Sequence, residues 1–69
     1  MDRTTKLYNF IKENLVDTGF ITIETLDQDC NINGFNMNTL ENLLFYHTSW
    51  HDLDQAQEAL DAGEFYSNM

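Results

Sequence analysis

The chain opens with apolar residues that recur three or four positions apart, as on one face of a helix: Leu7, Phe10, Ile11 and Leu15. Either Asp2 or Thr4 is suited to cap the start of this helix with its side-chain oxygen. Gly19 suits the left-handed position just past a helix end. The pattern therefore predicts an N-terminal helix over residues 4–18.

The pattern changes in residues 20–37. Residues 20–25 are rich in β-branched and aromatic side chains, which is typical of a strand. The dipeptide Asn33-Gly34 is the strongest short signal for a hairpin turn. A two-residue turn there would place four apolar side chains on one face: Cys30, Ile32, Phe35 and Met37. We predict a short β segment with a hairpin around Asn33-Gly34, and the competing interpretation is a short helix over Thr22–Asp29.

Two further helices are predicted in the second half of the chain. Asn38 with Glu41, and Ser49 with Asp52, each have the spacing of a capping box, so one helix should begin at Asn38 and the next after Ser49. Gly63 marks the end of the second. The apolar stripe of the first contains Leu40, Leu43, Leu44 and His47, and that of the second contains Leu53, Ala56 and Leu60. The predicted fold is α+β, mostly helical, in one domain over residues 1–69.

Composition supports one small folded domain without a disulfide. The chain has 69 residues, of which 42% are hydrophobic, so a core is available although a domain of this size is marginally stable. Cys30 is the single cysteine, which fits a reducing compartment. No apolar run has the length of a signal peptide core or a membrane span. We therefore expect a cytoplasmic protein.

Charge is the strongest functional signal in the sequence. The formal net charge is −9, and the only basic residues are Arg3, Lys6 and Lys12. Of the 12 acidic residues only Asp2 precedes Glu13, so the segment from Glu13 onward holds 11 carboxylates and no lysine or arginine. Such a surface repels phosphate backbones and anionic membranes, which argues against direct binding of nucleic acid or lipid. The expected partner is a basic protein surface, unless the charge serves only solubility.

The last predicted helix carries carboxylates in a row. Asp54, Glu58 and Asp61 follow one another at i, i+4 and i+7, which places them on one face. They rise about 6 Å and then about 4.5 Å along the helix axis. This spacing loosely approximates DNA phosphates, which are about 3.4 Å apart along each strand. Asp52 and Glu64 would extend the row, and the aromatic residues Tyr46, Trp50 and Tyr66 would anchor a partner.

Other chemistries are weakly supported. Residues 27–38 begin like a calcium loop, but Ile32 stands where glycine is required and Asn38 where a bidentate glutamate is expected. His47 and His51 are four residues apart, yet the predicted cap at Ser49 lies between them. Cys30 has no predicted base beside it. We therefore expect no enzyme activity, no cofactor and no metal site.

Two functions remain from the sequence. The first is a small acidic inhibitor or adaptor, of the kind that mimics nucleic acid, that occupies the basic surface of a nucleic-acid-handling protein. Its physical type is that of the inhibitors that phages direct against host restriction, CRISPR, transcription or repair enzymes. The alternative is a structural or assembly protein that forms a homodimer or larger oligomer through its surplus aromatic residues, with charge serving solubility.

Overall fold

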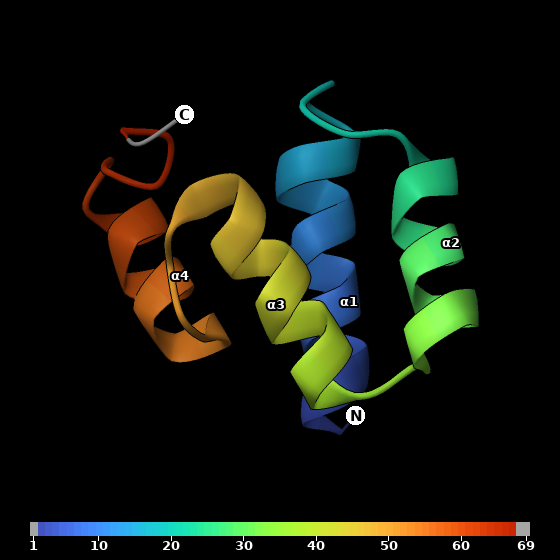
Figure 1. Ribbon diagram of the computed structural model, residues 1–69. Coiled ribbons are helices and arrows are strands. Elements are labelled where there is room, and N and C mark those ends of the chain that lie inside the picture. The colour runs from blue at the N-terminus through green and yellow to red at the C-terminus, as the bar shows by residue number, and fades with distance from the viewer. Residues whose placement is uncertain (1, 68–69) are drawn as a thin grey trace.

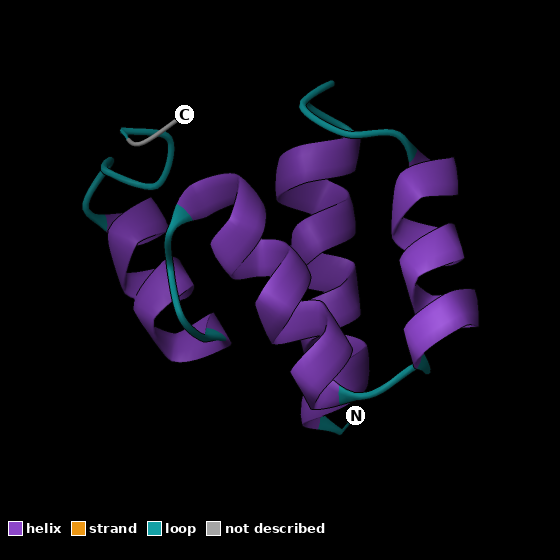
Figure 2. Ribbon diagram, in the orientation of Figure 1, coloured by secondary structure: helices purple, strands orange, loops and turns teal. Residues whose placement is uncertain are grey.

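Every regular element of the protein is a helix in the computed structural model, which describes residues 2–67 (Figures 1 and 2). The elements are α1 (Arg3–Ile11), a π-helical turn η1 (Lys12–Val16), α2 (Ile23–Asn33), α3 (Met37–Thr48) and α4 (Leu53–Asp61). No strand occurs in this part of the chain. The predicted α+β fold is therefore wrong, and the fold is all-α.

The predicted N-terminal helix is confirmed as a continuous helical segment made of α1 and η1. Asp2 caps it by accepting a hydrogen bond from the Thr5 backbone N–H at 2.8 Å. Its four predicted core residues are all buried. The segment widens into a π-helical turn where the Asn14 side chain donates to the Phe10 carbonyl at 2.9 Å. Gly19 has a φ of +89°, which is the left-handed conformation expected after the helix.

The prediction of a hairpin around Asn33-Gly34 is wrong. The competing interpretation, a helix, is confirmed as α2, which extends beyond the predicted end at Asp29. The Thr22 side chain accepts from the Thr25 N–H at 3.1 Å, which caps α2. Leu26 is fully buried within this helix. Asn33 is its last residue and Gly34, with a φ of +98°, ends it. The same two residue types suit a hairpin and a helix end, because both need a positive φ at glycine.

The predicted caps of the last two helices are displaced. Asn36 rather than Asn38 caps α3, and its side chain accepts from the Thr39 N–H at 2.9 Å. Asp52 caps α4 by accepting from the Gln55 N–H at 2.8 Å. Ser49 instead ends α3 in a left-handed conformation with a φ of 69°. Several polar residues in each connection satisfy the cap pattern, so spacing alone does not select the residue with extended backbone.

The helices enclose one hydrophobic core. α3 packs against α1 and α2, and Figure 1 shows α2 and α4 on opposite sides of the α1–α3 pair. Phe65, beyond α4, is buried in this core and meets the Phe10 ring edge-on at 5.4 Å. The buried apolar residues are Leu7, Phe10, Ile11, Leu15, Ile21, Leu26, Leu40, Leu43, Leu44, Ala56, Ala59 and Phe65. No helix of residues 2–67 is long and apolar enough to cross a membrane.

Candidate protein-binding surfaces

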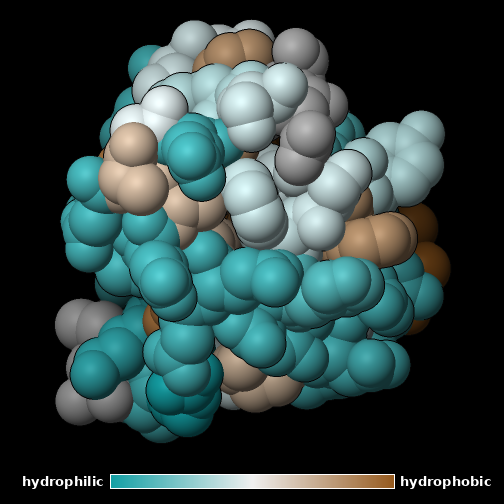
Figure 3. All heavy atoms as spheres, turned by 90° about the vertical axis from the view of Figure 1, so that its left-hand side faces the viewer, coloured by the Kyte–Doolittle hydropathy of each residue, from teal (hydrophilic) through white to brown (hydrophobic). Residues whose placement is uncertain are grey.

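The outer face of α4 carries the predicted row of carboxylates. Asp54, Glu58 and Asp61 are all exposed, and the opposite face of the helix buries Ala56 and Ala59. The two small residues let α4 approach the core closely, and the 3.6-residue period then turns the carboxylates toward solvent. Figure 3 shows the side of the molecule that carries α4, where hydrophilic residues dominate and apolar residues are scattered.

One end of the row is neutralised by the N-terminal helix. The Arg3 guanidinium lies 3.3 Å from the Asp54 carboxylate, and this is the single salt bridge among residues 2–67. Arg3, Lys6 and Asp54 line a shallow hollow between α1 and α4. At the other end, the Gln57 amide donates to Asp61 at 3.2 Å, a bond that leaves the negative charge in place. The unneutralised charge is therefore concentrated toward the C-terminal end of α4.

Glu64 lies close to Glu58 in the structure, whereas Asp52 is used for the helix cap. Glu58 and Glu64 line the same hollow of about 270 Å³ with Trp50. Asp52 is half-buried and its carboxylate accepts the Gln55 N–H. Glu64 therefore adds a carboxylate beside Glu58, whereas the carboxylate of Asp52 also caps α4. We call Asp54, Glu58, Asp61 and Glu64 the α4 acidic surface.

The three predicted aromatic anchors have different surroundings. Trp50 is half-buried, and its indole N–H donates to the Phe65 carbonyl at 2.9 Å. Tyr66 is also half-buried, with its hydroxyl donating to the Asn14 carbonyl at 3.0 Å. Tyr46 is 83% exposed and lies on α3, away from the α4 acidic surface. The structure thus brings Trp50, but not Tyr46, to the predicted acidic site.

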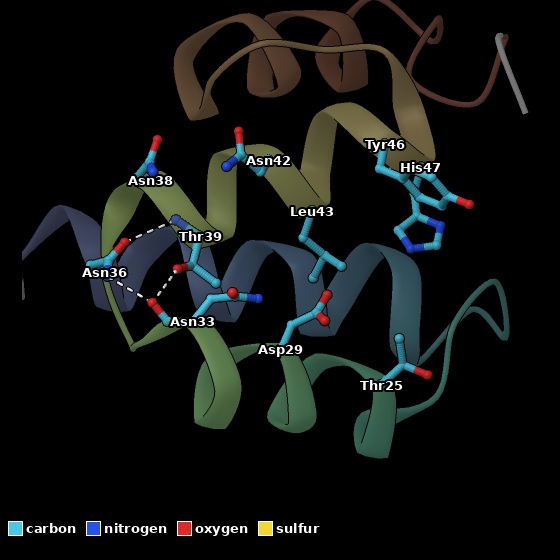
Figure 4. A pocket seen from close by; sticks show the side chains of 10 residues that line it. All are labelled: Thr25, Asp29, Asn33, Asn36, Asn38, Thr39, Asn42, Leu43, Tyr46 and His47. Atoms are coloured by element: carbon cyan, nitrogen blue, oxygen red, sulfur yellow. Dashed lines mark hydrogen bonds between the residues drawn. The ribbon is translucent and has the colours of Figure 1, made fainter.

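A second concave surface, absent from the sequence predictions, lies between α2 and α3. This groove has a volume of about 620 Å³, which is within the range of ligand sites in proteins. Its lining residues are shown in Figure 4: Thr25, Asp29, Asn33, Asn36, Asn38, Thr39, Asn42, Leu43, Tyr46 and His47. Of these only Tyr46 was predicted to bind a partner. The missed signal is the helical spacing of Thr25, Asp29 and Asn33, which the hairpin interpretation concealed.

The groups considered for metal binding or catalysis are dispersed. Asp27, Asp29 and Asn31 lie on helix α2, so they do not form a calcium loop. The His47 ring meets the Tyr46 ring edge-on, whereas the His51 ring stacks on Phe45 at 4.6 Å. Within residues 2–67 no three His, Cys, Asp or Glu side chains are placed to hold a metal ion.

Two side chains, Cys30 of α2 and Tyr8 of α1, have raised pKa values. Partial burial, followed by the charges of Asp27 and Asp29, raises the pKa of the Cys30 thiol. The thiol is therefore held in its protonated, less nucleophilic form. A hydrogen bond of 2.7 Å from the Tyr8 hydroxyl to the Asp27 carboxylate is the main cause that raises the pKa of Tyr8 to about 12. The negative charge of Asp27 contributes to both shifts in pKa, although it is the main cause of neither.

Comparisons with family models, with curated proteins and with solved structures give no match for this chain. The assignment of function therefore depends on the two surfaces themselves: the α4 acidic surface and the α2–α3 groove.

Proposed function

We propose that this protein acts by binding, as a small acidic inhibitor or adaptor that occupies a basic surface on another protein. The observation that carries the proposal is the α4 acidic surface, where exposed carboxylates are balanced by one cation, Arg3. Unbalanced like charges destabilise a compact domain, so their concentration on one helix favours a function that uses them.

The proposed partner is a protein that handles nucleic acid. Such proteins carry basic grooves shaped for a row of phosphates, and the carboxylates of Asp54, Glu58 and Asp61 form a row of exposed negative charge. Attraction over a Debye length of about 8–10 Å would accelerate encounter at physiological salt. Trp50, at the edge of the same surface, would add apolar contact. The proposed compartment is the cytoplasm, where the lone Cys30 would stay reduced.

The test compares two triple variants that change net charge by the same amount. In the first, Asp54→Asn, Glu58→Gln and Asp61→Asn neutralise the α4 row. In the control, Asp17→Asn, Glu24→Gln and Glu41→Gln neutralise three carboxylates outside α4. The immobilised wild type and control should capture the same proteins from a bacterial lysate, and the α4 variant should lose them. Duplex DNA should displace the captured proteins.

Salt supplies the second criterion. Capture should fall steeply as ionic strength rises from about 0.05 M to about 0.5 M, because screening shortens the reach of the carboxylates. Equal capture by both triple variants, or capture that is insensitive to salt and to DNA, would contradict the proposal.

A second candidate function, self-assembly, is supported by the exposed aromatic residues of α3. Phe45 and Tyr46 are 47% and 83% exposed, and large exposed aromatics are enriched at protein interfaces. Size-exclusion chromatography with light scattering distinguishes the two functions. A stable oligomer that Phe45→Ser and Tyr46→Ser dissociate, and that the α4 variant leaves intact, would favour assembly. A monomer at all concentrations would exclude it.

A further inference from the structure

The α2–α3 groove is built from two helix faces that meet at an angle. Thr25, Asp29 and Asn33 lie one helical turn apart along α2 and face α3. From the other side, Leu43 points toward α2, and Tyr46 and His47 stand at the C-terminal end of α3 (Figure 4). The groove is therefore a product of the packing of α2 on α3, and it lies on the opposite side of α3 from α4.

Hydrogen bonds close one end of the groove. The Asn33 carbonyl accepts from the Thr39 hydroxyl at 3.2 Å and from the Asn36 amide at 3.5 Å. Asn36 also accepts from the Thr39 backbone N–H, so the connection between α2 and α3 is tied at three points. Thr39 and Leu43, which form the floor, are 7% and 6% exposed. This end is consequently preorganised, which reduces the conformational entropy that the protein itself would lose on binding a ligand.

The remaining polar groups of the groove are open to a ligand. No hydrogen bond joins the side chains of Asp29, Asn33 or Asn42 to another residue in the part of the chain that the structure describes. Each asparagine amide offers one acceptor and two donors, as a polypeptide backbone requires from its partner. Asp29 is half-buried and supplies the negative charge. No lysine or arginine is among the described residues that line the groove.

These features select the class of ligand. An anion would be repelled by Asp29 and by the net charge of −9. An apolar ligand would find Leu43 as the only aliphatic side chain among the residues of 2–67 that line the groove, and it would bury polar amides without partners. A guanidinium group, in contrast, forms paired hydrogen bonds with a carboxylate and stacks on an aromatic face. Tyr46, with 83% of its surface exposed, provides such a face in the same groove.

We infer that the α2–α3 groove binds an arginine-containing peptide segment of a partner protein, with the guanidinium hydrogen-bonded to the Asp29 carboxylate and the Tyr46 ring as the aromatic face for the same cation. The asparagine amides bind the backbone of the segment. The groove involves other helices than the α4 acidic surface, so this inference does not depend on the function proposed above.

The experiment is a titration of the isotope-labelled full chain, followed by amide chemical shifts, with the peptide acetyl-Gly-Ser-Arg-Ser-Gly-amide. The matched probe replaces arginine by citrulline, which has nearly the same shape and no charge. The arginine peptide should cause saturable shifts at Asp29, Asn33 and Tyr46. The citrulline peptide should bind at least tenfold more weakly, because a charge-assisted hydrogen bond is lost.

Four variants test the assigned residues. Asp29→Asn should weaken binding of the arginine peptide about tenfold, whereas Glu24→Gln, an equal charge change on the exposed face of α2, should alter it less than about twofold. Tyr46→Leu should weaken binding about two- to fivefold by removing the aromatic face, and Tyr46→Phe should preserve it. The spectrum of each free variant shows whether the fold is retained.

Several outcomes would overturn the inference. Equal binding of the citrulline peptide would remove the cationic specificity. Equal effects of Asp29→Asn and Glu24→Gln would show general attraction to an acidic chain, and shifts confined to α4 would move the binding to the α4 acidic surface. Absence of saturable shifts at about 10 mM peptide, beyond the millimolar affinity expected of a weak site, would exclude the site. The α4 triple variant should still bind the peptide, which separates this test from that of the proposed function.

Discussion

The two outer helices, α2 and α4, flank the same α1–α3 pair and present different kinds of surface. α1 forms a polar contact with each: Tyr8 donates to Asp27 of α2 at 2.7 Å, and Arg3 pairs with Asp54 of α4 at 3.3 Å. α4 exposes a row of charge on a convex helix face, whereas α2 and α3 together form a groove that is lined mostly by residues with polar side chains and carries little charge. Charge alone acts at a distance and selects partners weakly, while a shaped polar groove acts only on contact and selects more narrowly.

The two regions also differ in what holds them to the core. α2 contributes Leu26, a large buried residue within the helix itself. α4 contributes two buried alanines and the half-buried Leu53 and Leu60, and the segment after it adds the fully buried Phe65, whose carbonyl also accepts the Trp50 indole N–H. The position of the α4 acidic surface therefore depends on a residue outside α4.

The largest expected effect follows from Phe65→Ala. Phe65 is 1% exposed, so truncation should lower the free energy of unfolding by about 3–5 kcal/mol. Domains of this length have a total of about 3–10 kcal/mol, so the variant should be largely unfolded or close to it. Denaturant unfolding followed by circular dichroism measures the loss. Phe45→Ala, at a residue that is 47% exposed, is the control and should cost about 1 kcal/mol or less.

A smaller effect tests the groove side of the comparison. Asn36→Ala removes the cap of α3 and the amide that donates to the Asn33 carbonyl, so it should lower the free energy of unfolding by about 1 kcal/mol. Asn38→Ala is the matched control, because Asn38 is exposed inside the first turn of α3. It should leave stability unchanged or raise it slightly, since alanine favours helix interiors. If Asn38→Ala lowered the free energy of unfolding more than Asn36→Ala, Asn38 would be the cap of α3, as the sequence predicts.

The smallest effect concerns the contact that joins α1 to α2. Because the pKa of Tyr8 is raised from 10.0 to about 12, the bound proton stabilises the folded state. The stabilisation is complete below about pH 10, the ordinary pKa of tyrosine, and is lost as the pH rises through about 12. Ultraviolet absorbance should show one tyrosine that ionises near pH 12, and Tyr8→Phe should abolish this phase. Tyr46→Phe should retain it, and a late phase that survives in Tyr8→Phe would refute the assignment.

Periodicity identified the elements that one stripe of side chains defines. The N-terminal helix was predicted with its buried residues, and the exposed face of α4 was predicted from its apolar positions. Both predictions were possible because a single apolar stripe on a helix determines which face packs against the core. α2 was given as a strand because β-branched residues 20–25 and the Asn33-Gly34 turn outweighed its sparse apolar positions. The local propensity of the α2 segment is compatible with a strand or a helix, and the burial of Leu26 against the other helices favours the helix.

By itself, the sequence determined the acidity, the confinement of its three cations to the first twelve residues, and the carboxylate row on the last helix. These are properties of composition and of one helical period, so they need no knowledge of neighbours. Only the tertiary structure decided that Arg3 neutralises one end of the row, that Trp50 and Tyr66 are engaged within the chain, and that Asp29 and Tyr46 share a groove. Each depends on residues distant in sequence, whose approach is set by the packing of whole helices rather than by any local pattern.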